Sequence, residues 1–236
     1  MPPGPGGCDD DGMEVLGDLV WTDLDGRRPL LVVPVGSLEQ HGPHLPLDTD
    51  TRIATAVAAR AVARCPDCVL GPAVAFGASG EHGDFPGTLS IGTDALVTML
   101  VELVRSADAF TGVVFVNGHG GNTDALRTAL DVTRDEGRRA HVWSPTVTDG
   151  DAHAGHTETS LLLAIDPSCV RIDALGPGET APLSELLDRL RDEGVRAVSP
   201  TGVLGDPTTA DVEAGERLLP MLVDDLVDHL TRWSRA

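Results

Sequence analysis

The chain has 236 residues, and its 37 acidic and 17 basic side chains leave a formal net charge of −20. A surface this acidic repels phosphate backbones and anionic lipids, so the composition argues against binding of nucleic acid or a membrane. No apolar run approaches the roughly 18–20 residues that span a bilayer. The first residues also lack the basic start and apolar stretch of a signal peptide, which favours a cytoplasmic location.

The predicted elements alternate between short apolar strands and longer amphipathic helices. Residues 1–12 are small, polar and acidic and predict a disordered leader, and the rest, 13–236, is expected to form a single domain. Apolar runs predict strands at 30–35, 69–74, 112–116 and 140–143. Helices are expected over 51–64, 93–108, 122–136, 158–165, 183–193 and 214–233. This alternation is typical of an α/β fold with a parallel sheet covered on both faces.

A polar cluster follows the first predicted strand directly. It contains two histidines, His41 and His44, and three acids, Glu39, Asp48 and Asp50. Imidazole and carboxylate together suit zinc, iron or manganese, and two residues that are two apart in an extended segment share a side. The cluster therefore predicts metal ligation, with a simple helix-capping role for its last acids as the alternative.

Two further clusters follow later strands. His119 stands in a glycine-rich turn, whose alternative reading is a turn without a chemical role, and no phosphate-binding glycine motif is present. His153, His156 and Glu158 gather at a predicted helix start, where an acid is also favoured by the helix dipole alone.

The loop over 77–88 is rich in glycine and polar residues. It predicts a substrate-facing loop through Ser79, Glu81 and His82, with a plain surface loop as the alternative. Because ligands of open parallel sheets bind at the carboxyl ends of the strands, all four clusters are expected to meet at one edge. Of the eight histidines, only His141 and His229 lie outside them.

Cys65 and Cys68 have the C-x-x-C spacing found in redox and zinc sites. No second pair or thioredoxin-like context accompanies them. We therefore expect reduced thiols at a helix-to-strand connection.

Three of these segments together resemble the creatininase family of metal-dependent amidohydrolases. They are EQHGPHLP at 39–46 with Asp50, NGHGGN at 117–122, and HAGHTETS at 153–160. The segments at 77–92 and 199–207 look closest to one branch of that family, the creatininase-like peptidases of mycofactocin biosynthesis.

The resemblance implies a three-layer α/β/α sandwich with a mainly parallel sheet, a homo-oligomer that is usually a hexamer, and two divalent metal ions. Zinc and iron are the expected metals, with manganese as an alternative. The implied ligands are Glu39, His41, His119 and a bridging Asp50. Creatininase has a further ligand, a Glu two residues after the turn histidine, where this chain has Gly121.

The resemblance also implies roles in catalysis. Glu158 is expected to replace the missing ligand, with a supporting role beside the ligands as the alternative. His153 is expected to assist at the substrate, and either His153 or Glu158 to pass a proton to the leaving amine. Since Ser37 and Ser160 have no triad partners and no G-x-S-x-G occurs, a serine nucleophile is not expected.

The branch implies a particular reaction: attack by metal-bound hydroxide on the Gly–Val bond of the radically modified precursor peptide. This cleavage releases the C-terminal Val–Tyr-derived pyrrolidinone. Two alternatives stay open, an amidohydrolase acting on a small cyclic amide or formamide, and a non-catalytic pathway scaffold.

Overall fold

The computed structural model describes residues 13–148 and 150–234, so the leader predicted at 1–12 lies outside the described residues. The sheet has four parallel strands: β1 (Leu30–Val35), β2 (Cys68–Leu70), β3 (Gly112–Asn117) and β4 (Ala140–Trp143). They lie in the order β2-β1-β3-β4. The single-domain organisation of 13–236 stays a prediction.

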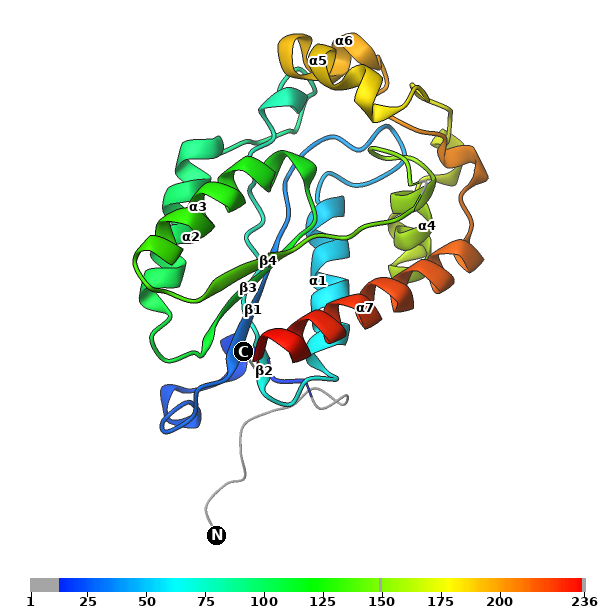
Figure 1. The fold of residues 1–236 in the computed structure, drawn as a ribbon. Helices are drawn as coiled ribbons and strands as arrows, with labels where there is room; N and C mark the ends of the chain where they lie inside the picture. The colour runs from blue at the N-terminus through cyan, green and yellow to red at the C-terminus, as the bar shows by residue number, and fades with distance from the viewer. Residues whose placement is uncertain (1–12, 149, 235–236) are drawn as a thin grey trace.

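Seven helices connect and cover the strands in the described part of the chain (Figure 1). They are α1 (Thr49–Val62), α2 (Thr93–Ser106), α3 (Thr123–Asp135), α4 (His156–Ile165), α5 (Leu183–Glu193), α6 (Val195–Val198) and α7 (Val212–Ser234). The predicted helices are confirmed to within a few residues at each end, and α6 is a short addition. None of these described helices is both long enough and apolar enough to cross a bilayer.

The central strands are buried on both faces, as their uniformly apolar sequences predict. Along β1 and β3, alternate side chains point to opposite faces because a strand has a period of two. Leu30 and Val32 pack into a core with α1, α4 and α7, whereas Leu31 and Val33 pack into a second core with α2 and α3. The expected three-layer α/β/α arrangement is therefore confirmed.

The strand β2 is shorter than its apolar run, which extends to Val74. Gly71 still donates a hydrogen bond to Val32 and Val74 one to Pro34. Pro72 between them has no N–H to donate, so regular pairing ends at Leu70 and only an isolated bridge joins Val74 to Val35.

The strand order reverses direction between β1 and β3. After β1 the chain passes through α1 to β2, on one side of the central pair of strands. After β3 it passes through α3, which covers the opposite face of the sheet, to β4 on the other side. The two connections diverge, and in open parallel sheets such a switch point creates the crevice that holds ligands. The loops that follow β1 and β3 carry the first two predicted clusters.

Candidate metal centre

Asp50 lies at the centre of the predicted site. Its Oδ1 is 2.9 Å from Nε2 of His41, and its Oδ2 is 3.4 Å from Nδ1 of His119. The Ser37 hydroxyl donates to Oδ2 at 2.6 Å. Because Asp50 stands in the first turn of α1 and the histidines follow β1 and β3, the switch point brings together side chains from distant parts of the chain.

The acidic and imidazole side chains of the described residues form three candidate donor groups: Glu39, His41 and His153 make up one, and the other two share Asp50. One contains Glu39, Asp50 and His119, and the other His41, Asp50 and Glu158. Within each group one ligand atom per residue lies within 4.8 Å of the others. This arrangement suits two neighbouring cations bridged by one carboxylate, and it brings together all five residues expected to be ligands.

Glu39 provides the test of whether a cation fits. Both of its carboxylate oxygens are buried and have no hydrogen-bond donor assigned to them among the described residues, although Nε2 of His119 lies 3.1 Å from one of them. A buried carboxylate without donors is costly. A divalent cation would satisfy it, and the mixed imidazole and carboxylate donors are those that zinc, iron and manganese accept.

Two histidines beside the buried carboxylates have raised pKa values. Burial lowers the pKa of His41, but the nearby Asp50, Glu158 and Glu39 carboxylates together outweigh burial and raise the pKa to about 10. Burial likewise opposes protonation of His119, whereas Glu39 and other acids raise its pKa well above the usual value. In the metal-free chain, protons on these rings supply the positive charge that the buried carboxylates need.

Glu158 and His153 flank the donor groups. Oε2 of Glu158 accepts a hydrogen bond from the Ala154 N–H at 2.6 Å and lies 3.9 Å from Nε2 of His41. Burial raises the pKa of Glu158 to about 7. Ala154 has a φ of 53°, which is unusual for a residue with a side chain, so the bond to Glu158 holds a strained turn in place.

His153 has one ring nitrogen committed and one free to face the donor groups. Its Nε2 lies 2.8 Å from the carbonyl oxygen of Gln40, to which it donates, and its Nδ1 is 3.8 Å from Oε1 of Glu39. Burial, aided by the nearby charge on His41, lowers the pKa of His153 to about 4. The ring is therefore neutral at pH 7.

The loop predicted to face substrate lies beside His119. The Ser79 hydroxyl is 3.5 Å from Nε2 of His119, and Oε1 of Glu81 is 3.4 Å from the same nitrogen. Nε2 of His82 is 3.4 Å from Oε1 of Glu39. Ser79 and His82 are buried, whereas Glu81 is partly exposed. The loop is close enough to reach a substrate held by the donor groups, and its direct contact with substrate stays a prediction.

Two buried amides connect these loops, and the sequence reasoning missed both. The Gln40 amide donates to Nδ1 of His82 and to the carbonyl oxygen of Gly202. The Asn122 amide donates to the Gly36 carbonyl oxygen and accepts from the Ala78 N–H, both at 2.9 Å. Their positions within the ligand motifs could have indicated a role at the site, because Gln40 lies between Glu39 and His41 and Asn122 ends the segment that contains His119.

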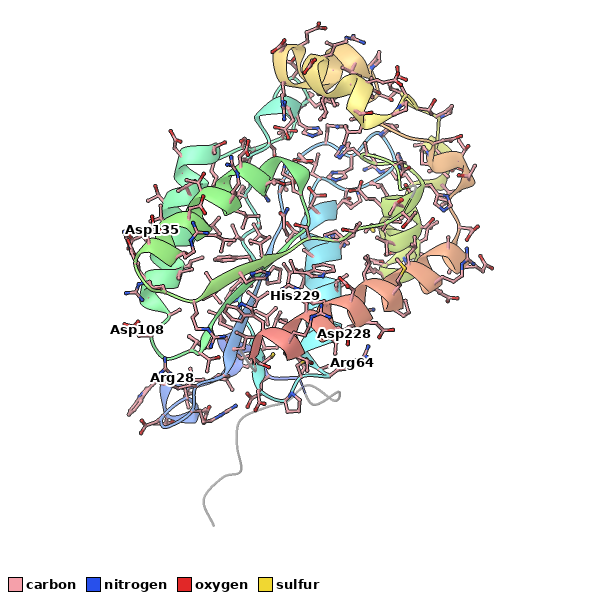
Figure 2. The ribbon with its side chains drawn as sticks, viewed as in Figure 1. Arg28, Arg64, Asp108, Asp135, Asp228 and His229 are labelled. Atoms are coloured by element: carbon pink, nitrogen blue, oxygen red, sulfur yellow. The ribbon has the colours of Figure 1, made fainter. Side chains whose placement is uncertain are left out.

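Not every histidine in the predicted clusters joins the centre. His41, His82, His119 and His153 gather there, but Nε2 of His44 pairs with the Thr159 hydroxyl and Nδ1 of His156 with the Thr209 hydroxyl, each at 3.0 Å. His141 and His229 stack on each other, with ring centroids 4.6 Å apart. Figure 2 labels His229 on α7, well away from the loops that carry the donor groups.

The cysteine pair lies away from the centre as well. Cys65 and Cys68 are free, buried thiols at the connection between α1 and β2. They line a separate cavity with Arg28 and Arg64, which Figure 2 places at the end of the molecule opposite α5 and α6. The expected position at a helix-to-strand connection is confirmed, and the reduced state of the thiols stays a prediction.

A cavity of about 770 Å³ gives access to the donor groups. Asp50, His119, His153 and Glu158 line it, as do Glu81 and residues of α5. The centre is therefore a buried set of polar side chains that opens to solvent through one wide pocket.

Comparison with known proteins agrees with this geometry. The family model for creatininase, described as creatinine amidohydrolase, matches residues 18–230. The mycofactocin precursor peptide peptidase of Mycolicibacterium smegmatis is 56% identical over 225 residues, covering 92% of this chain and 91% of that protein. The protein of the same name from Mycobacterium tuberculosis is 52% identical over 229 residues, covering 92% and 91%.

Solved structures of creatininases share the fold. A crystal structure of creatinine amidohydrolase superimposes with a TM-score of 0.80 at 26% identity, covering 93% of this chain and 97% of that one. A structure described as a manganese creatininase has a TM-score of 0.78 at 26% identity and covers 93% of this chain and 98% of that one. A mutant creatininase described as zinc–zinc type also has a TM-score of 0.78 at 26% identity and covers 92% of this chain and 97% of that one. With the family model matching most of its length, this chain belongs to the creatininase family.

Proposed function

We propose that this chain is a metal-dependent peptidase that cleaves the modified precursor peptide of mycofactocin. The chain is a hydrolase of C–N amide bonds by its family, and relatives more than 50% identical over nine-tenths of its length carry the peptidase name. The structural observation that carries the proposal is the shared Asp50, which joins two largely buried donor groups beside an open pocket.

Two divalent cations fit the donor groups. We assign one to Glu39, Asp50 and His119 and the other to His41, Asp50 and Glu158, with zinc or iron as the metals and manganese as the alternative. Such ions lower the pKa of bound water and polarise an amide carbonyl. The unpaired oxygens of Glu39 and the existence of zinc and manganese forms of creatininase support this assignment.

His153 is the residue best suited to move a proton. Its Nε2–H donates a hydrogen bond to the backbone carbonyl oxygen of Gln40. Nδ1 therefore carries the lone pair, and it lies 3.8 Å from Oε1 of Glu39. A neutral imidazole can accept a proton at Nδ1 and deliver it to the leaving amine. Glu158, whose pKa is near 7, is the second candidate for this transfer.

The expected scissile bond is the Gly–Val amide, and the expected small product is the C-terminal Val–Tyr-derived pyrrolidinone. A peptide segment needs more space than a single small ring does, and the open cavity of about 770 Å³ beside the donor groups is consistent with that need. A cytoplasmic location and a homo-oligomer, a hexamer by family resemblance, belong to the same proposal.

Mass spectrometry of the metal-loaded enzyme incubated with the modified precursor peptide tests the assignment. The expected products are a truncated peptide ending in Gly and a small C-terminal fragment. Asp50→Asn, which retains the shape of the side chain but loses a charge, is the inactive control. An intact peptide together with turnover of a small cyclic amide or formamide would favour the other amidohydrolase activity.

The scaffold alternative makes a different prediction, for metal content. All five proposed ligands are present and four of them are buried. We therefore expect stoichiometric divalent metal in protein purified anaerobically. Protein that neither retains nor takes up divalent metal would favour a scaffold.

A further inference from the structure

The cavity above the donor groups has an apolar wall that the proposed chemistry does not use. Leu183, Leu187 and Leu190 of α5 line it. Their spacing of four and three residues puts them on one face of the helix. Leu183 and Leu187 remain 44% and 37% exposed, so this face presents apolar surface to the opening of the cavity.

The position of α5 beside the centre is fixed by packing. Leu186 is buried against Val198 and Leu204, and both α5 and α6 pack on the short turn at Gly80–His82. Gly194, which ends α5 with a φ of 78°, lets the backbone pass close to the Glu81 carbonyl oxygen. Figure 1 shows α5 and α6 beyond the end of the sheet where these loops lie. The leucine face is thus held near the residues expected to face substrate.

Arg191 extends the same face of α5. It is exposed, it lines the cavity, and it makes no ion pair or side-chain hydrogen bond to any residue that the structure describes. It is the sole arginine among the described lining residues, and the chain has no lysine. The acidic residues lining the cavity are more numerous: Asp50, Glu81, Asp84, Asp124, Glu158 and Glu193. Apart from the two proposed metal ions, an anionic group entering this pocket therefore has one permanently charged basic side chain to meet among the described lining residues.

We propose that α5 is the helix that recognises the peptide substrate, with its leucine face holding an apolar side chain and Arg191 binding a carboxylate of the same peptide. This inference rests on the proposed peptidase function. Exposed apolar surface rimmed by polar residues is typical of a binding site, and arginine pairs strongly with carboxylates. Continuity of this face with the floor of the catalytic pocket favours the substrate over a second copy of the chain.

Steady-state kinetics of the metal-loaded enzyme with the modified precursor peptide test the leucine face. Burial of two leucine side chains predicts that a Leu183→Ser/Leu187→Ser double variant raises KM by about tenfold or more, with kcat unchanged within about twofold. Both leucines are exposed, so the fold should persist. Met221→Ser, at an exposed apolar position on α7, is the matched control and should leave KM unchanged.

A peptide in which amides replace the acidic side chains tests Arg191. Arg191→Gln should raise KM several-fold for the acidic peptide but not for the amide peptide. Arg217→Gln removes the same charge from α7 and should alter neither value. An effect of Arg191→Gln that is equal for both peptides would overturn the carboxylate contact.

Molar mass and metal content, measured on the same samples, separate the remaining outcomes. An unchanged KM in the double leucine variant would overturn the inference, whether or not the oligomeric state of that variant changes. Neither result would contradict the peptidase function. Failure of the wild-type enzyme to cleave the peptide would overturn the proposed function, and this inference with it.

Discussion

The carboxylate of Glu81 fills the space that a side chain at Gly121 would need. A Cβ atom built on Gly121 would lie 2.5 Å from Oε1 of Glu81 and 2.5 Å from the Ala78 carbonyl oxygen, and closer still to Nε2 of His119. The resemblance to creatininase leads us to expect a glutamate ligand at the matching position of that protein. In the present chain, Glu81 in the short turn at Gly80–His82 and Glu158 in the first turn of α4 lie near the centre instead.

Gly121→Ala is therefore expected to displace His119 or Glu81 and to reduce both bound metal and turnover, by about tenfold or more in kcat/KM. Gly120→Ala is the matched control, because a Cβ at Gly120 would meet nothing within 4 Å. Metal analysis and kinetics on both variants provide the check. Equal behaviour of the two variants would contradict the close packing at position 121.

His119→Ala should abolish turnover and lower bound metal, because the first donor group loses its imidazole. His156→Ala is a suitable comparison, since His156 comes from the predicted clusters but pairs with Thr209 away from the centre. We expect its metal content to equal that of the wild type. Full activity in His119→Ala would show that the glycine-rich turn supplies no ligand.

Asp50 and Glu158 should differ in how many cations they hold. Asp50 is shared by both donor groups and Glu158 belongs to one. Asp50→Asn is expected to lose both ions, whereas Glu158→Gln should retain one ion per chain. Stoichiometry by plasma mass spectrometry distinguishes the two, and two retained ions in Glu158→Gln would assign that carboxylate a supporting role.

Metal binding should release protons and strengthen as pH rises. The pKa of His41 is raised to about 10 in the metal-free fold from about 6.5, so its pairing with Asp50 stabilises the fold fully below pH 6.5 and is lost as pH rises through 10. A metal ligand must be unprotonated. Each ion loaded at pH 7.5 therefore displaces at least one proton, which calorimetry in buffers of different ionisation heat would detect. A heat independent of the buffer would contradict this protonation state.

The sheet and its polar edge were predictable because they depend on local patterns. Strands β1 and β3 are apolar throughout, and their burial follows from that pattern whatever the partners are. Glu39 and His119 follow parallel strands closely, and Asp50 lies where the loop after the first strand enters a helix, so their meeting was predictable. The early end of β2 also had a local cause, because Pro72 lies within the apolar run at 69–74 and cannot donate a backbone hydrogen bond.

The direction of individual side chains was not predictable in the same way. His44 lies within the first motif yet turns to Thr159, which is 115 residues away in the chain. The amide of Asn122 reaches Gly36, 86 residues earlier. Such pairings depend on tertiary neighbours, and neither the strand pattern nor the spacing within a loop contains them. The approach of α5 to the cavity has the same origin.

The ligands proposed for the first cation come from both sides of the switch point. Asp50 opens the helix that packs into one core, and His119 precedes the helix that packs into the other. An ion held by both would cross-link the two hydrophobic halves of the molecule. Chelation should then lower the thermal denaturation midpoint of the whole chain, so the melting temperature reports, without any substrate, whether a preparation is loaded.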